Sequence, residues 1–184
     1  MVLDACVLMS GIVRRLMLRL AEAGAFQPVW SERIGDEWRR NAARIWQIDP
    51  QRLADEWADM QRRFPLADCG DAQGFEQGLK YSDAKDWHVI ATARAAQGAG
   101  AENVAILTWN LKDFNRSELR RMGLRALDPD RYLSERWQQD AMQLALACET
   151  IAQDAAALGG TPQPLREALR RERLYRLQAL AAPA

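Results

Sequence analysis

The sequence predicts an α/β domain with a mainly parallel sheet, followed by two further helices. Up to Asp130, short apolar runs typical of buried strands alternate with capped, amphipathic helical segments. Beyond Asp130, a series of apolar residues from Leu133 to Ala155 recurs at the three- and four-residue steps of a helix. We therefore expect one folded domain over residues 1–133 and a C-terminal helical hairpin over residues 134–184.

The first part of the chain predicts two strands and three helices. Two short apolar runs, "VLDACVL" at residues 2–8 and "FQPVW" at residues 26–30, are typical of buried strands, and the first contains Asp4. Three amphipathic stretches each begin with a side chain that caps helices. The helices are expected at residues 10–24, 31–46 and 49–64. Their capping residues are Ser10, Ser31 and Asp49.

The rest of the chain continues the alternation and then becomes helical. A helix is expected from Asp83 or Asp86 to about Gln97, followed by the apolar strand "NVAILTW". A short helix "RSELRRMG" and a last strand "LRAL" come next. One long helix is expected from Leu133 to Ala155, then a break at "GGTPQP", then a second helix "LREALRRERLYRLQALAA".

The composition limits the possible partners and location. The 184 residues carry 25 Lys and Arg against 25 Asp and Glu, so contact with a nucleic acid must come from local patches. The positive residues are nearly all arginine. The three cysteines lie far apart and indicate a reduced, cytoplasmic protein. The N-terminal segment has no basic, apolar leader pattern, and no membrane contact is expected.

Acidic residues lie where the predicted sheet should present a site. In parallel sheets, sites form where strands end and helices begin. Asp4 ends the first strand, Asp86 begins a helix, and Glu37 lies in the helix after the second strand. Asn110 and Asp113 follow the strand "NVAILTW". We expect these side chains to gather at one edge of the sheet.

Each of these carboxylates also has a structural interpretation. Glu37 can pair with Arg33 and Arg40 on its own helix, and Asp113 can cap the turn before "NRSEL". Asp83 can cap the helix that carries Asp86 in its first turn. A carboxylate within an apolar strand is costly to bury unless it is paired or bound to metal.

A divalent cation explains the acidic residues jointly. Carboxylates are hard oxygen ligands, which suit Mg²⁺ or Mn²⁺. We expect Asp86 both to cap its helix and to bind the metal, while Asp83 stays open between the two roles.

Four segments, taken in order, resemble the PIN-domain family and, within it, the VapC-type toxin ribonucleases of type II toxin–antitoxin pairs. They are "VLDACVL", "SERIGDEWRRN", "SDAKDWHVIATA" and "ILTWNLKDF". The resemblance spans roughly residues 1–133. It implies a three-layer α/β/α domain and a Mg²⁺- or Mn²⁺-dependent endoribonuclease that leaves a 5′-phosphate on the downstream product.

The resemblance also implies roles for individual residues. Asp4, Glu37 and Asp86 match the family's catalytic, metal-binding acids, and Asp83 is a possible helper. The segment "TWNLKDF" matches at Thr108, Asn110, Asp113 and Phe114, of which Thr108 and Asn110 are expected to bind substrate. The chain departs from the pattern at Cys6 and at Asn110, where many members have a further aspartate. The fourth ligand therefore stays open between Asp113, Asp83 and none.

The expected partners are RNA, a cognate antitoxin and a second copy of the chain. Arginines are expected to contact RNA phosphates, and Trp109 to stack a base or to pack in the core. The arginines are Arg14, Arg15, Arg39, Arg40, Arg116, Arg120 and Arg121, of which Arg40 lies beside Glu37 on its helix. His88, the only histidine, is interpreted as a packing or surface residue. Apolar anchors for an antitoxin are expected at Leu16, Leu20, Ile34 and Trp38.

Three other functions compete with the toxin interpretation. One is a catalytically impaired PIN-like module that binds protein or RNA, which Asn110 and the neutral net charge favour. Another is an RNA-processing nuclease that is not a toxin. A phosphotransfer enzyme of the haloacid-dehalogenase type is disfavoured, because its "D-x-D" motif would place an aspartate where this chain has Cys6.

Overall fold

The chain forms two compact units in the computed structural model, which describes residues 1–151, 154 and 164–182. The first unit comprises Met1–Met9 and Gln27–Leu127, and the second comprises Ser10–Phe26 and Asp128–Ala184. The predicted domain division, 1–133 and 134–184, stays a prediction.

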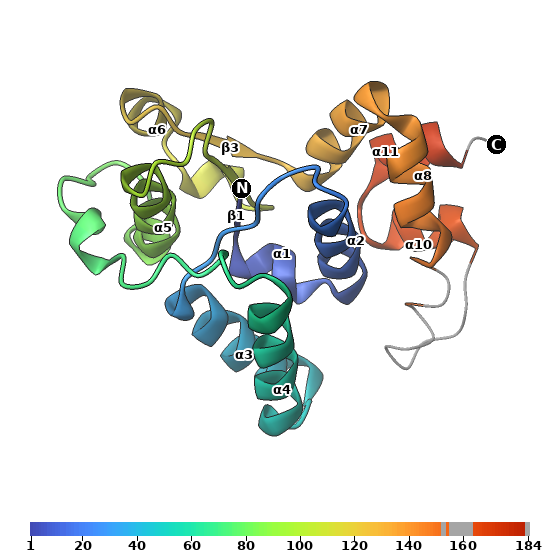
Figure 1. The fold of residues 1–184 in the computed structure, drawn as a ribbon, viewed down its shortest axis with the longest axis horizontal. Helices are drawn as coiled ribbons and strands as arrows, with labels where there is room; N and C mark the ends of the chain where they lie inside the picture. Colours follow the sequence, from blue (N-terminus) through green and yellow to red (C-terminus); the bar gives the residue numbers. More distant parts are fainter. Residues whose placement is uncertain (152–153, 155–163, 183–184) are drawn as a thin grey trace. The chain divides into compact units, whose positions relative to one another are not determined.

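The first unit is built on a parallel sheet of three short strands (Figure 1). The strands stand in the order β1 (Val2–Leu3), β2 (Ala105–Leu107) and β3 (Arg125–Leu127). Isolated parallel bridges join Val2 to Val29 and Trp30 to Asp68. Both β1 and β2 are entirely buried, as expected of strands with apolar neighbours on both faces. The predicted α/β fold with a parallel sheet is confirmed.

The predicted strand at residues 2–8 is wrong beyond Leu3. The chain turns directly after Asp4 into α1 (Ala5–Met9), because the Asp4 carbonyl accepts hydrogen bonds from the Val7 and Leu8 N–H groups at 2.9 and 3.2 Å. A short, fully buried helix and a buried strand show the same unbroken apolar run, so periodicity does not separate them. Residues 26–30 likewise make only isolated bridges and no strand.

The main helices of the first unit occur where they were predicted. They are α3 (Glu32–Trp46), α4 (Pro50–Arg63), α5 (Trp87–Gly98) and α6 (Arg116–Arg121). Short 3₁₀ turns stand between them, as η1 (Gln73–Glu76), η2 (Ala84–Asp86) and η3 (Leu111–Asp113). Helix α5 packs against β1 and β2, and α3 packs against α1, α4 and α5.

Helices α3 and α4 lie side by side around an aromatic contact (Figure 1). A Cβ atom at Gly35 would stand 2.5 Å from the Trp57 ring, so only glycine fits at this position of α3. The Trp57 ring packs in turn against Trp30 and Trp38, at centroid distances of 5.6 and 6.2 Å. This packing holds the helix that carries Glu37.

The second unit is helical in the residues that the structure describes. Its helices are α2 (Gly11–Glu22), α7 (Pro129–Gln139), α8 (Ala141–Glu149), α10 (Leu165–Arg171) and α11 (Tyr175–Ala181). Helix α2 begins at Ser10, whose hydroxyl accepts the Val13 N–H as predicted. It packs against α8, and Arg19 on α2 binds the buried Asp154 carboxylate at 2.5 and 2.6 Å.

Both helices predicted for the C-terminal part are interrupted. Asp140 separates α7 from α8 and caps α8 by accepting the Gln143 N–H at 2.9 Å. Arg173 has a positive φ of 62° and separates α10 from α11. The end of the predicted long helix, at Ala155, lies outside the described residues, as do residues 159–163 of the predicted break.

Several side chains predicted to face solvent are buried instead. The four expected antitoxin anchors are each at most 1% exposed, so they belong to the core and cannot serve as anchors: Leu16, Leu20, Ile34 and Trp38. Arg14 is 3% exposed and therefore cannot line an RNA path. None of the described helices is long and apolar enough to cross a membrane.

Candidate functional site

Asp4 stands at the carboxyl end of β1 and is almost completely buried. Its N–H donates to the Leu107 carbonyl at 3.1 Å, which continues the pairing of β1 with β2. Its Oδ2 accepts hydrogen bonds from the Thr108 hydroxyl at 2.6 Å and the Cys6 thiol at 3.0 Å. Burial raises the pKa of Asp4, and the charge of Glu37 adds to this rise, although the two hydrogen bonds oppose it.

Thr108 supports Asp4 through a hydrogen bond, and its side chain is not exposed to a substrate. We predicted Thr108 as a substrate-binding residue, but its side chain is completely buried. Its hydroxyl donates to Asp4 and accepts the Asn110 N–H at 3.0 Å. Thr108 therefore connects the end of β1 to the loop after β2.

The two aspartates before α5 have different roles. Asp83 caps the turn η2, because its carboxylate accepts the Lys85 N–H at 3.0 Å. Asp86 stands at the N-cap position of α5 but makes no side-chain capping hydrogen bond. The expectation that Asp86 caps its helix is therefore wrong. Asp83 caps the preceding turn, and the Asp86 carboxylate is left without a capping hydrogen bond.

Other carboxylates lie close enough to Asp86 to influence its pKa. Burial raises this pKa, and the charges of four neighbouring carboxylates raise it further, to about 6. These neighbours are Asp4, Asp113, Glu37 and Asp83. The structure thus brings the other four predicted acidic ligands within electrostatic reach of Asp86.

Asp113 reaches this group from the loop after β2. The Asp83 N–H donates to the Asp113 carbonyl at 2.8 Å, which ties the two acidic loops together. The turn before "NRSEL" is η3, whose N-cap residue is Asn110 and which has no side-chain capping hydrogen bond. The next helix, α6, is capped by Asn115, which accepts the Glu118 N–H at 2.9 Å. The capping interpretation of Asp113 is therefore wrong.

Glu37 reaches the group from α3. Its Oε2 lies 3.0 Å from Nε2 of His88 on α5, and its side chain is 31% exposed. Arg33, one of its two expected partners, pairs with Glu76. The direction of the His88 N–H does not meet hydrogen-bond geometry, so the 3.0 Å distance marks a close contact and not an aligned hydrogen bond.

A pocket of about 770 Å³ collects most of the predicted site residues. Those that line it are Glu37, Arg40, Asp83, Asp86, Asn110 and Asp113. Asp4 and Thr108 do not line it, and Asp4 acts on the pocket through its charge. One pocket in the first unit therefore holds acids from three separate segments, around α3, η2 and η3.

The donor set has the chemistry of a site for a hard divalent cation. Its ligands are carboxylate oxygens, which Mg²⁺ and Mn²⁺ prefer. Among residues 1–151, 154 and 164–182, no group of three or more His, Cys, Asp or Glu side chains stands close enough together to hold an ion without rearrangement.

Several residues that line this pocket were not predicted from the sequence as site residues. Lys85 and Lys112 line it and are exposed, and His88 lines it from α5. A signal existed for the lysines: the chain has only three, and two of them flank the acidic motifs. For His88 the sequence carried no signal, because its contact with Glu37 joins two helices far apart in the chain.

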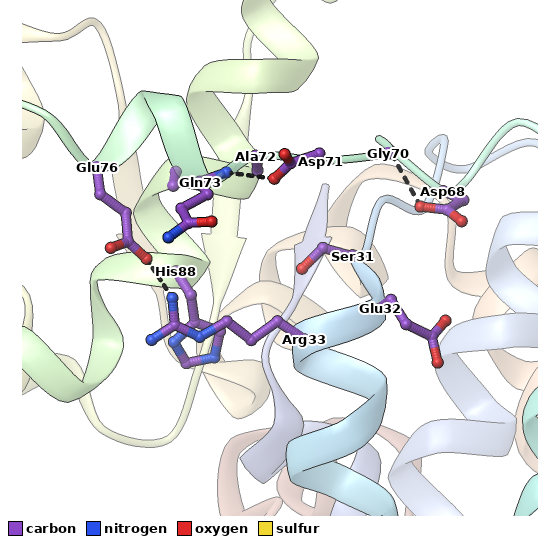
Figure 2. A pocket seen from close by; sticks show the side chains of 11 residues that line it. Ser31, Glu32, Arg33, Asp68, Gly70, Asp71, Ala72, Gln73, Glu76 and His88 are labelled. Atoms are coloured by element: carbon purple, nitrogen blue, oxygen red, sulfur yellow. Dashed lines mark hydrogen bonds and ion pairs between the residues drawn. The ribbon is translucent and has the colours of Figure 1, made fainter.

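A second pocket of about 530 Å³ shares Arg33 and His88 with the first (Figure 2). Its lining is also acidic, with Glu32, Asp68, Asp71 and Glu76. Figure 2 shows Arg33, Glu76 and His88 among the lining of this pocket, with Arg33 paired to Glu76. Arg33 and His88 thus form a wall common to both pockets.

Comparison with known proteins gives one match. A family model described as "PIN domain" matches residues 1–112, which include β1, β2 and the segments that carry all five acidic residues except Asp113. Neither the curated proteins nor the solved structures contain a match to this chain.

Proposed function

The chain belongs to the PIN-domain family, and from this premise we propose that it is a metal-dependent endoribonuclease. PIN domains are usually nucleases and generally use divalent metal ions. The observation that carries the proposal is the single pocket lined by Glu37, Asp83, Asp86 and Asp113, and the raised pKa of Asp86, about 6, supports it. Strongly perturbed acids in a pocket are typical of catalytic sites. The choice of RNA as substrate rests on the resemblance of the four motifs.

Three residues of this chain would hold the cation in the proposed site. Asp4, Glu37 and Asp86 are its main ligands, and Asp83 and Asp113 complete the acidic surroundings. When bound, Mg²⁺ or Mn²⁺ would lower the pKa of a coordinated water and neutralise charge on the phosphate under attack. The Thr108 hydroxyl and the Cys6 thiol orient Asp4 by donating to the same carboxylate oxygen.

The rim of the pocket provides positive charge for the RNA backbone. Lys85, Lys112, Arg33 and Arg40 line the same pocket as the acids. Lysine offers a compact point charge to a phosphate, whereas arginine readily forms bidentate pairs with carboxylates. Two lysines beside an acidic cluster can therefore attract the RNA backbone without blocking the carboxylates through bidentate ion pairs. Asn110 lies in the same lining and is proposed to hydrogen-bond the substrate.

Cleavage of a short single-stranded RNA tests the proposed activity. The purified wild type should cleave it with Mg²⁺ or Mn²⁺, and EDTA should stop the reaction. Asp4→Asn should lose cleavage, because it removes the buried negative charge of the site. Asp59→Asn is the matched control, since Asp59 lies outside the pocket and pairs with Arg62 on α4. Equal cleavage by Asp4→Asn and Asp59→Asn would contradict the proposal.

The competing function is a catalytically impaired module that binds RNA or protein. Two observations favour it: Asn110 replaces an acid of the motif, and the described carboxylates form no ready three-ligand group. The same assay separates the two functions. If the protein is folded and binds RNA but shows no metal-dependent cleavage, the binding-module function is established.

We further propose that the nuclease acts as the toxin of a toxin–antitoxin pair. An arginine of a cognate antitoxin can pair bidentately with the pocket carboxylates and displace the cation. Expression of the wild type should slow bacterial growth, whereas Asp86→Asn should not, and the antitoxin should restore growth. If Asp86→Asn slows growth equally, the toxin proposal fails. Cleavage in vitro without growth inhibition would indicate an RNA-processing nuclease.

A separate measurement, light scattering, would test the expected homodimer.

A further inference from the structure

We propose that His88 is a positioning residue that holds Glu37 toward the other acids of the pocket, an inference that rests on the proposed function. His88 is 4% exposed and lies in the first turn of α5, whereas Glu37 lies on α3. Their side chains approach to 3.0 Å, between Nε2 and Oε2. No other basic side chain is paired with Glu37 among the residues that the structure describes.

The buried ring of His88 needs a hydrogen-bond partner. Neither Nδ1 nor Nε2 has a partner with hydrogen-bond geometry in the described part of the chain. Buried polar atoms are nearly always satisfied, and an unsatisfied one costs about 1–3 kcal/mol. The Glu37 carboxylate is the acceptor already at hydrogen-bond distance, and rotation about its last side-chain bond is broad and inexpensive. We therefore assign His88 as the donor and Glu37 as the acceptor.

The tautomer of His88 follows from the same contact. If Nε2 lacked a hydrogen, its lone pair would face a carboxylate oxygen at 3.0 Å and repel it. The ring therefore carries its hydrogen on Nε2, pointing toward Glu37. A histidine that donates to a metal-binding carboxylate is a supporting residue, because it fixes the direction of the ligand.

A second contact fixes the two helices at this level. The Thr92 hydroxyl, one turn along α5, approaches the Ser31 hydroxyl at 2.9 Å and donates to the His88 carbonyl at 2.8 Å. Ser31 stands at the N-cap position of α3, the helix that carries Glu37. The Thr92–Ser31 contact therefore sets the register of α5 against α3 and places His88 opposite Glu37.

Without His88, Glu37 has an alternative partner on its own helix. Arg40 is three residues away on α3, at the spacing of helical ion pairs, and lines the same pocket. Pairing with Arg40 would draw the carboxylate toward the rim. We infer that His88 prevents this capture and keeps Glu37 available as a ligand.

The metal affinity of His88 variants tests the inference without cleavage. By calorimetry, His88→Leu should bind Mn²⁺ about 10–100-fold more weakly, the cost typical of removing a group that supports a ligand. His88→Gln, which keeps an N–H donor, should recover part of the affinity. Adding Arg40→Gln to His88→Leu should recover affinity as well. In cleavage, His88→Leu should lower kcat and leave KM for RNA nearly unchanged.

Nuclear magnetic resonance tests the contact independently of the proposed function. Because the chain has a single histidine, an untagged sample gives one set of imidazole signals. We expect the Nε2–H tautomer, with signals that shift in Glu37→Gln and stay in place in Asp36→Asn. The Nδ1–H tautomer, no response to Glu37→Gln, or unchanged Mn²⁺ affinity in His88→Leu would overturn the role of His88. A wild type that shows the contact but neither binds Mn²⁺ nor cleaves RNA would instead overturn the nuclease.

Discussion

Glu118 and Asp86 are two carboxylates of the same unit with opposite environments. Glu118 is 5% exposed and accepts three backbone N–H groups, from Lys80, Tyr81 and Ser82, at 2.7–3.1 Å. Burial alone would raise its pKa, but the hydrogen bonds outweigh burial and lower it. Asp86 has no capping hydrogen bond, and burial with four carboxylate neighbours raises its pKa to about 6.

The difference separates a structural acid from a candidate functional one. Glu118 uses its charge to fix the segment of residues 80–82, which leads directly into Asp83 and Asp86. Asp86 keeps its charge available within the pocket. A hydrogen-bonded carboxylate thus holds the loop that presents Asp86, which has no side-chain capping hydrogen bond. In the second unit, Asp130 repeats the structural role, since it accepts the N–H groups of Arg176 and Leu177.

The largest expected effect is a loss of RNA cleavage without a loss of stability when Asp86 is replaced. Asp86→Asn should reduce RNA cleavage at least about a hundredfold, because metal ligation contributes several kcal/mol to transition-state stabilisation. The midpoint of thermal unfolding, measured without metal, should stay constant or rise, since one of five repelling charges is removed. A clear drop in this midpoint would place Asp86 in the same structural class as Glu118.

Glu118→Ala should show the reverse pattern in stability. It leaves three buried or partly buried N–H groups without an acceptor, and we expect a loss of about 3 kcal/mol in the free energy of unfolding. Urea denaturation measures this loss. Glu135→Ala, at an exposed residue paired with Arg131, is the control and should cost little. Equal stability of the two variants would refute the structural role of Glu118.

Asp130→Ala should destabilise the second unit by a smaller amount. Its carboxylate accepts two N–H groups at the start of α11, compared with three for Glu118, so about 2 kcal/mol is expected. Hydrogen exchange should become faster at Arg176 and Leu177 than elsewhere in the unit. If exchange there is unchanged, water or another acceptor replaces the carboxylate.

The dependence of stability on pH should differ in sign for the two acids. The folded state raises the pKa of Asp86 from 3.8 to about 6, so it binds more protons than the unfolded chain over this interval. Asp86 therefore makes the metal-free protein less stable as pH rises from about 4 to 6. The lowered pKa of Glu118 has the opposite effect, because its contribution is lost as pH falls through the folded-state pKa.

Asp86→Asn should isolate the contribution of Asp86 to this profile. Comparing its unfolding midpoint with that of the wild type at pH 4 and pH 6, without metal, should give a larger stabilisation at pH 6. The same difference at both pH values would contradict the raised pKa.

The smallest effect concerns the positive rim. Lys112→Gln should raise KM for RNA about threefold at low salt, because it removes one exposed phosphate contact. The difference should shrink at high salt, where exposed charges are screened. Lys80→Gln is the control, since Lys80 does not line the pocket. A loss of kcat without a change in KM would assign Lys112 to the reaction itself.

Local capping chemistry in the sequence predicted several elements correctly. Asp49-Pro50 begins α4, Ser10 begins α2, and the apolar run around Ile106 forms a parallel strand. Capping depends on atoms within a few residues, so the sequence contains it directly. The sequence also contains a capping residue at Asp140, although no helix start was predicted there. Asp140 caps α8 by accepting the Gln143 N–H.

Tertiary contacts account for the errors. The start of α11 is held by Asp130, which lies far away in the chain and accepts the N–H groups of Arg176 and Leu177 in the first turn of that helix. Leu16 and Trp38 were predicted as exposed anchors, because a helical periodicity identifies an apolar face but not what covers it. The sequence did not indicate that β1 ends at Leu3, because the residues of β1 and most residues of α1 are buried alike.

For the site, the sequence by itself determined which acids are available and at which ends of strands and helices they stand. Parallel strands present their carboxyl ends at one edge, so Asp4 and Asp113 could be assigned to the same edge in advance. Only the tertiary structure decided that Asp83 caps the turn while Asp86 stays uncommitted, and that His88 faces Glu37. Those outcomes depend on hydrogen-bond geometry and charge between side chains that only folding brings together.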